Sequence, residues 1–303
     1  MSKPKKRPPV KIRPLLERYG IVPDAEHGQN FIIDRNLIDR EVSLAEVRKK
    51  DIVLEIGPGI GILTEALARK AKHVVAVEID TQFRDILADL QQHSPNLEVI
   101  FDDALTAEFP FFSKVVSNLP FKVALPIVFK LMDYDFELAI LVCQERLARR
   151  ITAKPGDTGY SRISVQVARR TEARLLYTIS KTKFYPSPNV DAALLQLKGV
   201  APKFEVPSEQ FFKEVLKYFF AFREKSVTKA LNTLKAFAIS KSEMMRARRL
   251  IGERIARKEV LAVTPPEFGR ITRIIWDEFG DLTRRFYKYY DKMNLYQRDT
   301  EQL

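Results

Sequence analysis

Small residues that a ligand can approach closely follow one short apolar run of the chain. The run IVLEI (52–56) leads into EIGPGIG (55–61), where Gly57, Gly59 and Gly61 predict a turn from a strand into a helix. Glycine lets a ligand come near the backbone and accepts backbone angles that other residues avoid. Position 62 is isoleucine, so the turn lacks the third glycine of the dinucleotide pattern G-x-G-x-x-G.

Acidic residues lie at the ends of the next two apolar runs. Glu78 is near the end of VVAVEI (74–79), and Asp103 follows LEVIF (97–101). In a doubly wound sheet the carboxyl ends of neighbouring strands lie together, so Glu78 can accept the hydroxyls of a ribose beside the glycine turn. Asp103 can accept from an adenine amino group, although it or Asp102 can equally cap a turn. Three such strand ends, with an acidic residue before the glycines, predict a pocket for S-adenosylmethionine (AdoMet).

The stretch SNLPF (117–121) suits an adenine amino group as the methyl acceptor. This nitrogen is a poor nucleophile because its lone pair is delocalised into the ring. The Asn118 side-chain oxygen and the Leu119 backbone carbonyl can accept both of its protons, which favours a tetrahedral nitrogen with an available lone pair. Pro120 holds the turn, and Phe121 offers a stacking face worth about 1–3 kcal/mol. We expect alignment to dominate the chemistry, with no His or Lys general base at the pocket; the alternative is a plain turn beside a core Phe.

The elements that must position these residues alternate between short apolar runs and helical patterns. This alternation predicts an α/β fold: a doubly wound, Rossmann-like sheet of the AdoMet-dependent methyltransferase kind, with a smaller, all-helical C-terminal domain. The last two apolar runs, 173–179 and 192–198, are expected to pair as an antiparallel edge. Strands are expected at 52–56, 74–79, 97–101, 115–118 and 138–143, and helix starts at Asp34, at Ser240 with Glu243 and at Thr264 with Glu267.

The charge is distributed unevenly and divides the chain into three parts. Residues 1–18 carry seven Lys or Arg, one Glu and four prolines, which predicts a basic flexible arm. Residues 19–202 are nearly neutral and form the expected AdoMet-binding catalytic domain. Residues 203–303 carry 21 Lys or Arg against 14 Asp or Glu, which predicts a helical RNA-binding domain. A basic surface that is merely solvated is the alternative.

Composition excludes several classes of protein. No apolar run approaches the roughly 20 residues that cross a bilayer, and the basic start has no apolar segment behind it, so it is not a secretory signal. The lone cysteine, Cys143, lies in the apolar run LAILVC and is expected to be buried. With three histidines and one cysteine, the sequence offers no metal-ligand cluster. We expect a cytoplasmic monomer without a metal or membrane partner.

The motifs together resemble the ribosomal RNA adenine N6,N6-dimethyltransferases of the KsgA type, kin of the erythromycin-resistance methylases. The resemblance runs from about 26 to 275 and includes GQNFIID (28–34), EIGPGIG and NLPF. QERLARRI (144–151), GYSRISV (159–165) and FYPSPNVDAAL (184–194) extend it. It implies AdoMet-dependent dimethylation of the N6 amino group of adjacent adenosines in small-subunit rRNA during ribosome biogenesis, with an immature small ribosomal subunit as partner.

The resemblance also implies roles for individual residues. Phe184 would be a second aromatic against the target adenine, opposite Phe121. The implied catalytic residues are Asn118, Leu119, Pro120, Phe121 and Phe184. The implied cofactor-binding residues are Gln29, Asn30, Ile32, Gly57, Gly59, Glu78, Asp103, Ala104 and Asn118. The basic residues expected to bind RNA are Arg223, Lys225, Lys229, Arg246, Arg248 and Arg249.

The sequence departs from the family pattern at several positions. Phe121 stands where most members have Tyr, which preserves stacking but removes a hydroxyl. The late loop reads VDAA where many members have VDS, and Glu224 interrupts a run that is usually more basic. The tail after about 280 matches no motif.

Two other functions are open at this stage. One is an adenine methylase acting on another nucleic acid, either large-subunit rRNA, as in antibiotic resistance, or DNA. NLPF and the helical C-terminal domain argue against the resistance type. The other is a non-catalytic transcription or ribosome-assembly factor on the same fold. The presence of Glu78, Asp103, Asn118 and Phe121 favours live chemistry over a pure binding role.

Overall fold

A computed structural model describes residues 11–24, 28–234, 239–280 and 282 of the 303-residue chain. The chain divides into two compact units. The first comprises residues up to Ala148 together with Glu172–Gly199, and the second comprises Arg149–Thr171 together with the residues from Val200 onward. The segment 149–171 therefore belongs with the C-terminal helices, whereas the sequence division at residue 202 assigns it to the catalytic domain.

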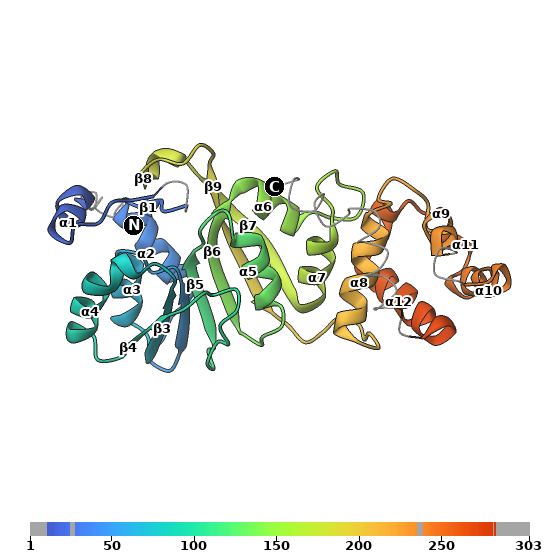
Figure 1. Ribbon diagram of the computed structural model, residues 1–303, viewed down its shortest axis with the longest axis horizontal. Coiled ribbons are helices and arrows are strands. Elements are labelled where there is room, and N and C mark those ends of the chain that lie inside the picture. Colours follow the sequence, from blue (N-terminus) through green and yellow to red (C-terminus); the bar gives the residue numbers. More distant parts are fainter. Residues whose placement is uncertain (1–10, 25–27, 235–238, 281, 283–303) are drawn as a thin grey trace, which may run out of the picture. The chain divides into compact units, whose positions relative to one another are not determined.

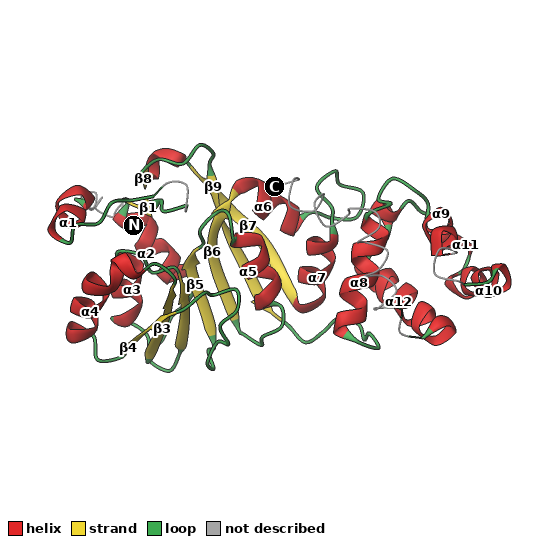
Figure 2. Ribbon diagram, in the orientation of Figure 1, coloured by secondary structure: helices red, strands yellow, loops and turns green. Residues whose placement is uncertain are grey.

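The first unit is built on a seven-stranded sheet in the order β4-β3-β2-β5-β6-β9-β7 (Figures 1 and 2). The strands β2 to β6 run parallel, and β9 is antiparallel to β6. The strand order reverses between β2 and β5, which is where open α/β sheets bind ligands. The strands are β2 (Ile52–Ile56), β3 (His73–Glu78), β4 (Leu97–Phe101), β5 (Lys114–Asn118), β6 (Leu138–Gln144), β7 (Thr171–Ile179) and β9 (Ala192–Gly199).

The strand predictions are confirmed to within about two residues, and β9 and β7 are neighbours at the edge of the sheet. Apolar runs form the interior strands because both faces of a parallel sheet are covered by helices. Helix α2 begins after Asp34, whose side chain accepts from the Asn36 amide, as its capping position predicts. From α2 onward, the described helices of this unit are α2 (Arg35–Leu44), α3 (Ile62–Ala68), η1 (Thr81–Phe83), α4 (Arg84–His93), α5 (Ala124–Leu131) and η2 (Lys181–Lys183).

Residues 12–18, which the sequence places in a flexible arm, form helix α1 (Ile12–Arg18) instead. Ile12 and Leu16 are buried against Phe83 and Leu87. Their four-residue spacing puts both on one helix face, and burying that face stabilises a helix that is too short to be stable alone. The part of the predicted arm before residue 11 lies outside the described residues.

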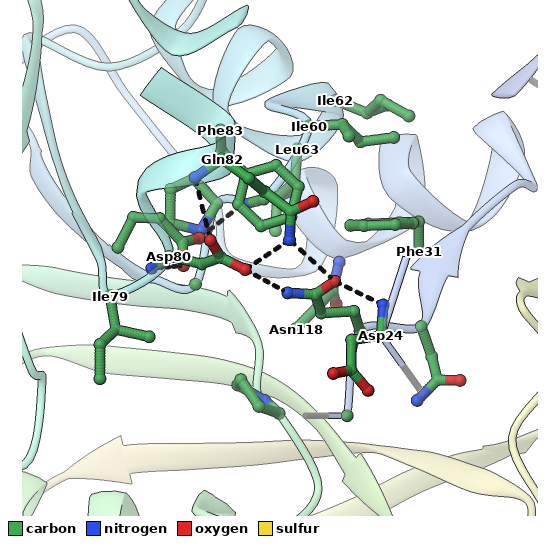
Figure 3. Close-up of a pocket in the computed structure, with 18 of the residues that line it drawn as sticks. Asp24, Phe31, Ile60, Ile62, Leu63, Ile79, Asp80, Gln82, Phe83 and Asn118 are labelled. Atoms are coloured by element: carbon green, nitrogen blue, oxygen red, sulfur yellow. Dashed lines mark hydrogen bonds between the residues drawn. The ribbon is translucent and has the colours of Figure 1, made fainter. Parts of the chain in front are cut away.

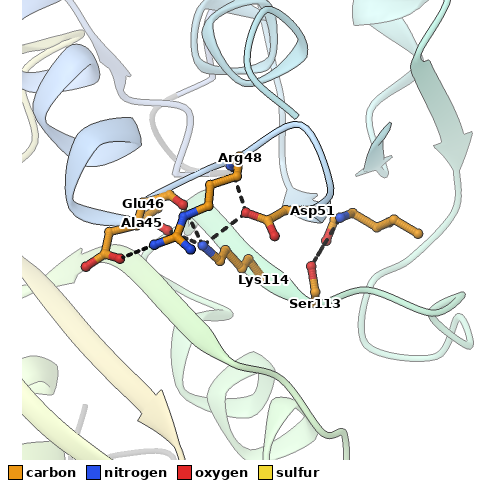
Figure 4. Close-up of polar contacts among 7 residues, drawn as sticks. Ala45, Glu46, Arg48, Asp51, Ser113 and Lys114 are labelled. Carbon is orange, nitrogen blue, oxygen red and sulfur yellow. Dashed lines mark hydrogen bonds and ion pairs between the residues drawn. The ribbon is translucent and has the colours of Figure 1, made fainter. Parts of the chain in front are cut away.

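A buried ion pair ties β5 to the chain that precedes β2. Lys114 Nζ lies 3.0 Å from Asp51 Oδ2, and both side chains are almost fully buried. The same ammonium donates to the carbonyl oxygens of Ala45 at 3.0 Å and Glu46 at 2.6 Å (Figure 4). These extra acceptors offset the desolvation that makes an isolated buried pair unfavourable. The amino ends of the two central strands are thereby held together.

The second unit is helical, as predicted for the C-terminal part of the chain. Its core includes buried aromatic rings from α8 and α12, among them Phe211, Phe219 and Phe268. The predicted capping boxes at Ser240 and Thr264 are both present. Its helices are α7 (Arg162–Arg170), α8 (Glu209–Phe220), α9 (Val227–Asn232), α10 (Lys241–Ile251), α11 (Glu253–Ala256), η4 (Val260–Ala262) and α12 (Pro265–Phe279), and α6 (Glu145–Thr152) spans the boundary between the units.

Candidate active site

The turn after β2 is closed by a carboxylate from the tip of β3. Gly57, Gly59 and Gly61 all have positive φ, at 72°, 53° and 77°, which explains why glycine is needed at each. The Gly59 amide donates to Glu78 Oε2 at 2.9 Å, and the Asp80 amide donates to Glu78 Oε1 at 2.9 Å. Burial raises the pKa of Glu78, and these backbone hydrogen bonds partly oppose the rise. Glu78 therefore shapes the glycine turn and also lines the pocket beside it.

The SNLPF turn lies directly against the glycine turn. A Cβ atom on Gly57 would meet the Pro120 ring at 3.5 Å, and one on Gly28 would meet the Phe121 amide nitrogen at 3.4 Å. Ser117 fixes this arrangement from below, because its hydroxyl donates to the Ile56 carbonyl at 2.6 Å and accepts from the Ile56 amide at 3.3 Å. The motifs at 28–34, 55–61 and 117–121 are thus brought together at the switch point of the sheet.

These motifs enclose a pocket of about 730 Å³. Asn30 Oδ1 and Asn118 Oδ1 are buried at the pocket and have no hydrogen-bond partner within the described residues. Unpartnered buried polar atoms at a cavity call for a polar ligand. Eight of the predicted site residues line the pocket: Gln29, Asn30, Ile32, Gly57, Gly59, Glu78, Asn118 and Pro120.

Asp80 and Gln82 form a side-chain network at the pocket (Figure 3), and Gln29 belongs to it. Its Oε1 accepts from the Asp24 amide at 2.8 Å, and its Nε2 donates to Asp80 Oδ2 at 2.7 Å. Gln82 completes the network by donating to Asp80 and, at 3.3 Å, to Gln29 Oε1. The network fastens the chain before β1 to the tip of β3. The parts of Asp80 and Gln82 in this network were not predicted from the sequence; the position of Asp80 as the cap of η1 is a local signal that could have identified them.

The predicted residues Asp103 and Ala104 do not line this pocket. Asp103 Oδ1 accepts from the Leu105 amide at 2.8 Å, which is the turn-capping alternative. Lys122, by contrast, lines the pocket with an exposed side chain, although no Lys was expected there. No local pattern separates Lys122 from other exposed lysines, because its position at the pocket depends on the turn that precedes it.

The two predicted aromatic residues meet beside the pocket. The rings of Phe121 and Phe184 lie 6.4 Å apart, centroid to centroid, at an angle of 68°. Phe184 is brought there by the short antiparallel pair of β1 (Phe31–Ile32) and β8 (Phe184–Tyr185), in which Ile32 pairs with Phe184. Phe184 is buried and Phe121 is half-buried. The edge-to-face contact means that the rings do not form a parallel clamp in this conformation.

A second carboxyl lies deeper in the same pocket. Glu55, just before the glycine turn, is 1% exposed. Burial raises the pKa of Glu55 to about 8, the Thr64 side chain opposes the rise, and the charge of Glu78 adds to it. Two carboxyls of raised pKa, Glu55 and Glu78, thus face one pocket.

The six predicted RNA-binding residues fall into paired and unpaired groups. Arg246 and Arg248 form ion pairs with Glu278 at 3.0 Å and Glu253 at 2.8 Å. Arg223 donates to the Thr158 carbonyl at 2.6 Å. Three side chains are exposed and have no ion-pair partner in the described parts of the chain: Lys225, Lys229 and Arg249.

The described residues contain no group of three or more His, Cys, Asp and Glu side chains placed to hold a metal ion. No helix among them is long and apolar enough to span a membrane.

The sheet order, the glycine turn with its strand-tip carboxylate and the Asn118 turn beside it define a Rossmann-like methyltransferase. The order β4-β3-β2-β5-β6-β9-β7 with an antiparallel β9 carries the site at the crevice between β2 and β5.

Comparisons with known proteins identify the family. A sequence model described as "Ribosomal RNA adenine dimethylase" matches residues 24–259, and the chain belongs to that family. A "Probable ribosomal RNA small subunit methyltransferase A" of Pyrococcus furiosus is 37% identical over 263 residues, covering 86% of this chain and 94% of the relative. The resemblance stated from the motifs is confirmed, and the chain is an rRNA adenine methyltransferase.

Solved structures agree on the fold. The crystal structure of a dimethyladenosine transferase from Plasmodium falciparum is similar with a TM-score of 0.73 and 24% identity, covering 82% of this chain and 98% of that one. The crystal structure of the 23S rRNA methyltransferase ErmE is similar with a TM-score of 0.61 and 28% identity, covering 81% of this chain and 99% of that one.

Proposed function

We propose that this enzyme transfers methyl groups from AdoMet to the N6 amino group of adjacent adenosines in small-subunit rRNA, and that it acts as a cytoplasmic monomer on immature small ribosomal subunits. The small-subunit assignment is supported by the name of the Pyrococcus furiosus relative, of which the chain covers 94%. Neither a non-catalytic factor nor a DNA methylase is favoured by the family match.

The single observation that carries the proposal is the contact between the Asn118 turn and the glycine turn. Pro120 packs against Gly57, so an acceptor held at Asn118 and a donor held at the glycine turn would be neighbours. AdoMet, when bound, supplies an electrophilic methyl group. The residues that would hold it are Asn30, Gly57, Gly59 and Glu78, because they combine a close-approach backbone, a carboxylate and an unpartnered amide oxygen in one 730 Å³ pocket.

Asn118 and Leu119 are assigned to the acceptor base. The Asn118 Oδ1 has no partner within the described chain and is free to accept an N6 proton. The Leu119 amide donates to the Val142 carbonyl at 2.9 Å, which holds the peptide that follows Asn118 in place. Accepting both N6 protons localises the nitrogen lone pair and stabilises positive charge as it develops. Phe121 would stack on the base after it leaves its helix.

Asp103 and Phe184 have supporting roles in this proposal. Asp103 would need to give up its turn-capping bond, or to bind the adenine of AdoMet through its second oxygen. Phe184 would pack beneath Phe121 and not opposite it, given the edge-to-face contact. The exposed Lys225, Lys229 and Arg249 would bind phosphates of the RNA.

Nucleoside mass spectrometry tests the proposal. The enzyme and AdoMet are incubated separately with small and large ribosomal subunits that lack adenine methylation, and the digested RNA is analysed. We expect N6,N6-dimethyladenosine from small subunits only. Methylation of large subunits alone would contradict the substrate assignment, and no methylation of either would contradict the reaction.

A further inference from the structure

A buried carboxyl with no hydrogen-bond partner lies on the helix that covers the active-site face of the sheet. Glu41 of α2 is 1% exposed and lies on the same buried face as Ile38 and Val42. Neither of its carboxyl oxygens has a hydrogen-bond partner of normal geometry within the described chain. A buried polar group without a partner is unfavourable for folding, so its presence calls for another explanation.

The strand register shows what Glu41 faces. Val53 of β2 and Val116 of β5 belong to the same buried cluster as Ile38 and Val42 of α2. Side chains two residues apart on a strand point to the same face, so Glu55 and Asn118 also face α2. Glu55 is as deeply buried as Glu41, and the Asn118 Oδ1 is buried without a partner.

The electrostatics agree with this placement. Burial raises the pKa of Glu41 well above its usual range, the charge of Glu55 raises it further, and the Asn118 side chain opposes the rise. Burial raises the pKa of Tyr177 of β7 to about 12; Arg40, which lies 4.4 Å from the Tyr177 ring centroid, opposes the rise, and the charge of Glu41 adds to it. The neighbours of Glu41 thus include one carboxyl, one phenol and the Asn118 amide.

We infer that Glu41 is a positioning residue for methyl transfer: when the acceptor base occupies the pocket, the Glu41 carboxyl accepts the side-chain N–H of Asn118 and so turns Asn118 Oδ1 toward the acceptor amine. This inference rests on the proposed function. The two ends of a carboxamide have nearly the same shape, and only their partners decide which end faces which way. Asn118 with its NH₂ group toward the adenine amine would set donor against donor.

The carboxyl performs this role in either protonation state. An ionised carboxylate accepts through both oxygens, and a protonated one still accepts through its carbonyl oxygen. An apolar side chain of similar size would leave the orientation of Asn118 undetermined.

A double-mutant cycle tests the role. Glu41→Met replaces the carboxyl with an unbranched apolar group, and Glu41→Gln keeps a carbonyl acceptor. Both are combined with Asn118→Ala, and kcat, KM for RNA, the AdoMet dissociation constant and the melting temperature are measured. We expect Glu41→Met to lower kcat roughly 10- to 100-fold, the range of one well-placed hydrogen bond. Both binding constants should stay within about threefold.

The matched variant and the cycle separate positioning from stability. Glu41→Gln should stay within about fivefold of the wild-type kcat, since its carbonyl can replace the carboxyl. Glu41→Met should melt at or above the wild-type temperature, because it removes a buried carboxyl. Adding it to Asn118→Ala should cause no further loss, as expected when one residue acts through another.

Three outcomes would overturn the inference. They are an unchanged kcat in Glu41→Met, an additive loss in the double variant, or a loss of activity that follows a drop in melting temperature. If Glu41→Met does not fold, Glu41→Leu is read in its place. Absence of transfer by the wild-type enzyme would contradict the proposed function itself, and so is distinguishable from failure of the Glu41 role.

Discussion

The backbone amide of Gly59 donates a 2.9 Å hydrogen bond to Glu78 Oε2, so the carboxylate expected to bind a ribose also closes the glycine turn. One residue on β3 therefore sets the shape of the loop that follows β2. The same loop packs against Pro120 through Gly57, which links the cofactor side of the pocket to the acceptor side. Small changes at this loop are expected to affect both sides.

Substituting Gly59 by alanine should weaken AdoMet binding. A Cβ atom there would lie 2.9 Å from the Phe31 ring, at a φ of 53° that alanine adopts only with strain of about 1–2 kcal/mol. We expect the AdoMet dissociation constant to rise at least about tenfold by isothermal titration. Gly20→Ala is the matched control, because Gly20 has a φ of 63° but open space around its Cβ position. Equal affinities in both variants would contradict the role of the turn.

Glu55 should make stability depend on pH. Folding raises its pKa from 4.5 to about 8, so the folded chain keeps a proton that the unfolded chain releases in this range. The contribution of Glu55 to the free energy of unfolding should be highest below about pH 4.5. This contribution should fall as the pH rises toward 8, by up to about 1.4 kcal/mol per pH unit.

Glu55→Gln removes this dependence and provides the comparison. The free energy of unfolding is measured for both proteins by urea denaturation and circular dichroism. The value for Glu55→Gln, relative to that of the wild type, should increase as the pH is raised from 5 to 8. Parallel pH profiles of the two proteins would show that Glu55 does not titrate as its burial implies.

Phe121 should contribute to binding of the target base. Phe121→Ala removes a stacking face worth about 1–3 kcal/mol, so kcat/KM for RNA should fall roughly 5- to 150-fold. Phe121→Tyr keeps the face and should stay within about threefold of the wild type. Because Phe121 does not line the cofactor pocket, AdoMet affinity should be unchanged in both variants. A wild-type kcat/KM in Phe121→Ala would exclude stacking on this ring.

Local patterns were sufficient to predict the strands, the glycine turn and the helix caps. Asp34, Ser240 and Thr264 cap helices because a capping side chain bonds to residues two or three positions away. Likewise, Gly57 follows β2 and Glu78 ends β3, and the ends of these strands meet because the strands are parallel neighbours. These features depend on short sequence distances or on one rule of sheet topology.

Features that depend on long-range packing could not be predicted. A glutamate in a helix is usually exposed, and the burial of Glu41 follows only from how α2 packs on β2 and β5. The edge-to-face contact of Phe121 with Phe184 depends on the pairing of β1 with β8. Each of these strands has two residues, which is too few for a recognisable strand pattern in the sequence. Helix α1 forms because Ile12 and Leu16 pack against buried residues that lie far away in the sequence, such as Phe83 and Leu87.

The most direct test of the account is the single-turnover rate of methyl transfer by Asn118→Ala, measured with saturating AdoMet and unmethylated small ribosomal subunits. Asn118 is assigned to the acceptor amine, so the rate should fall at least about 100-fold, the effect of removing a hydrogen-bond acceptor that acts in the transition state. AdoMet and RNA binding should remain. A rate within threefold of the wild type would contradict the assignment of this turn to the chemistry.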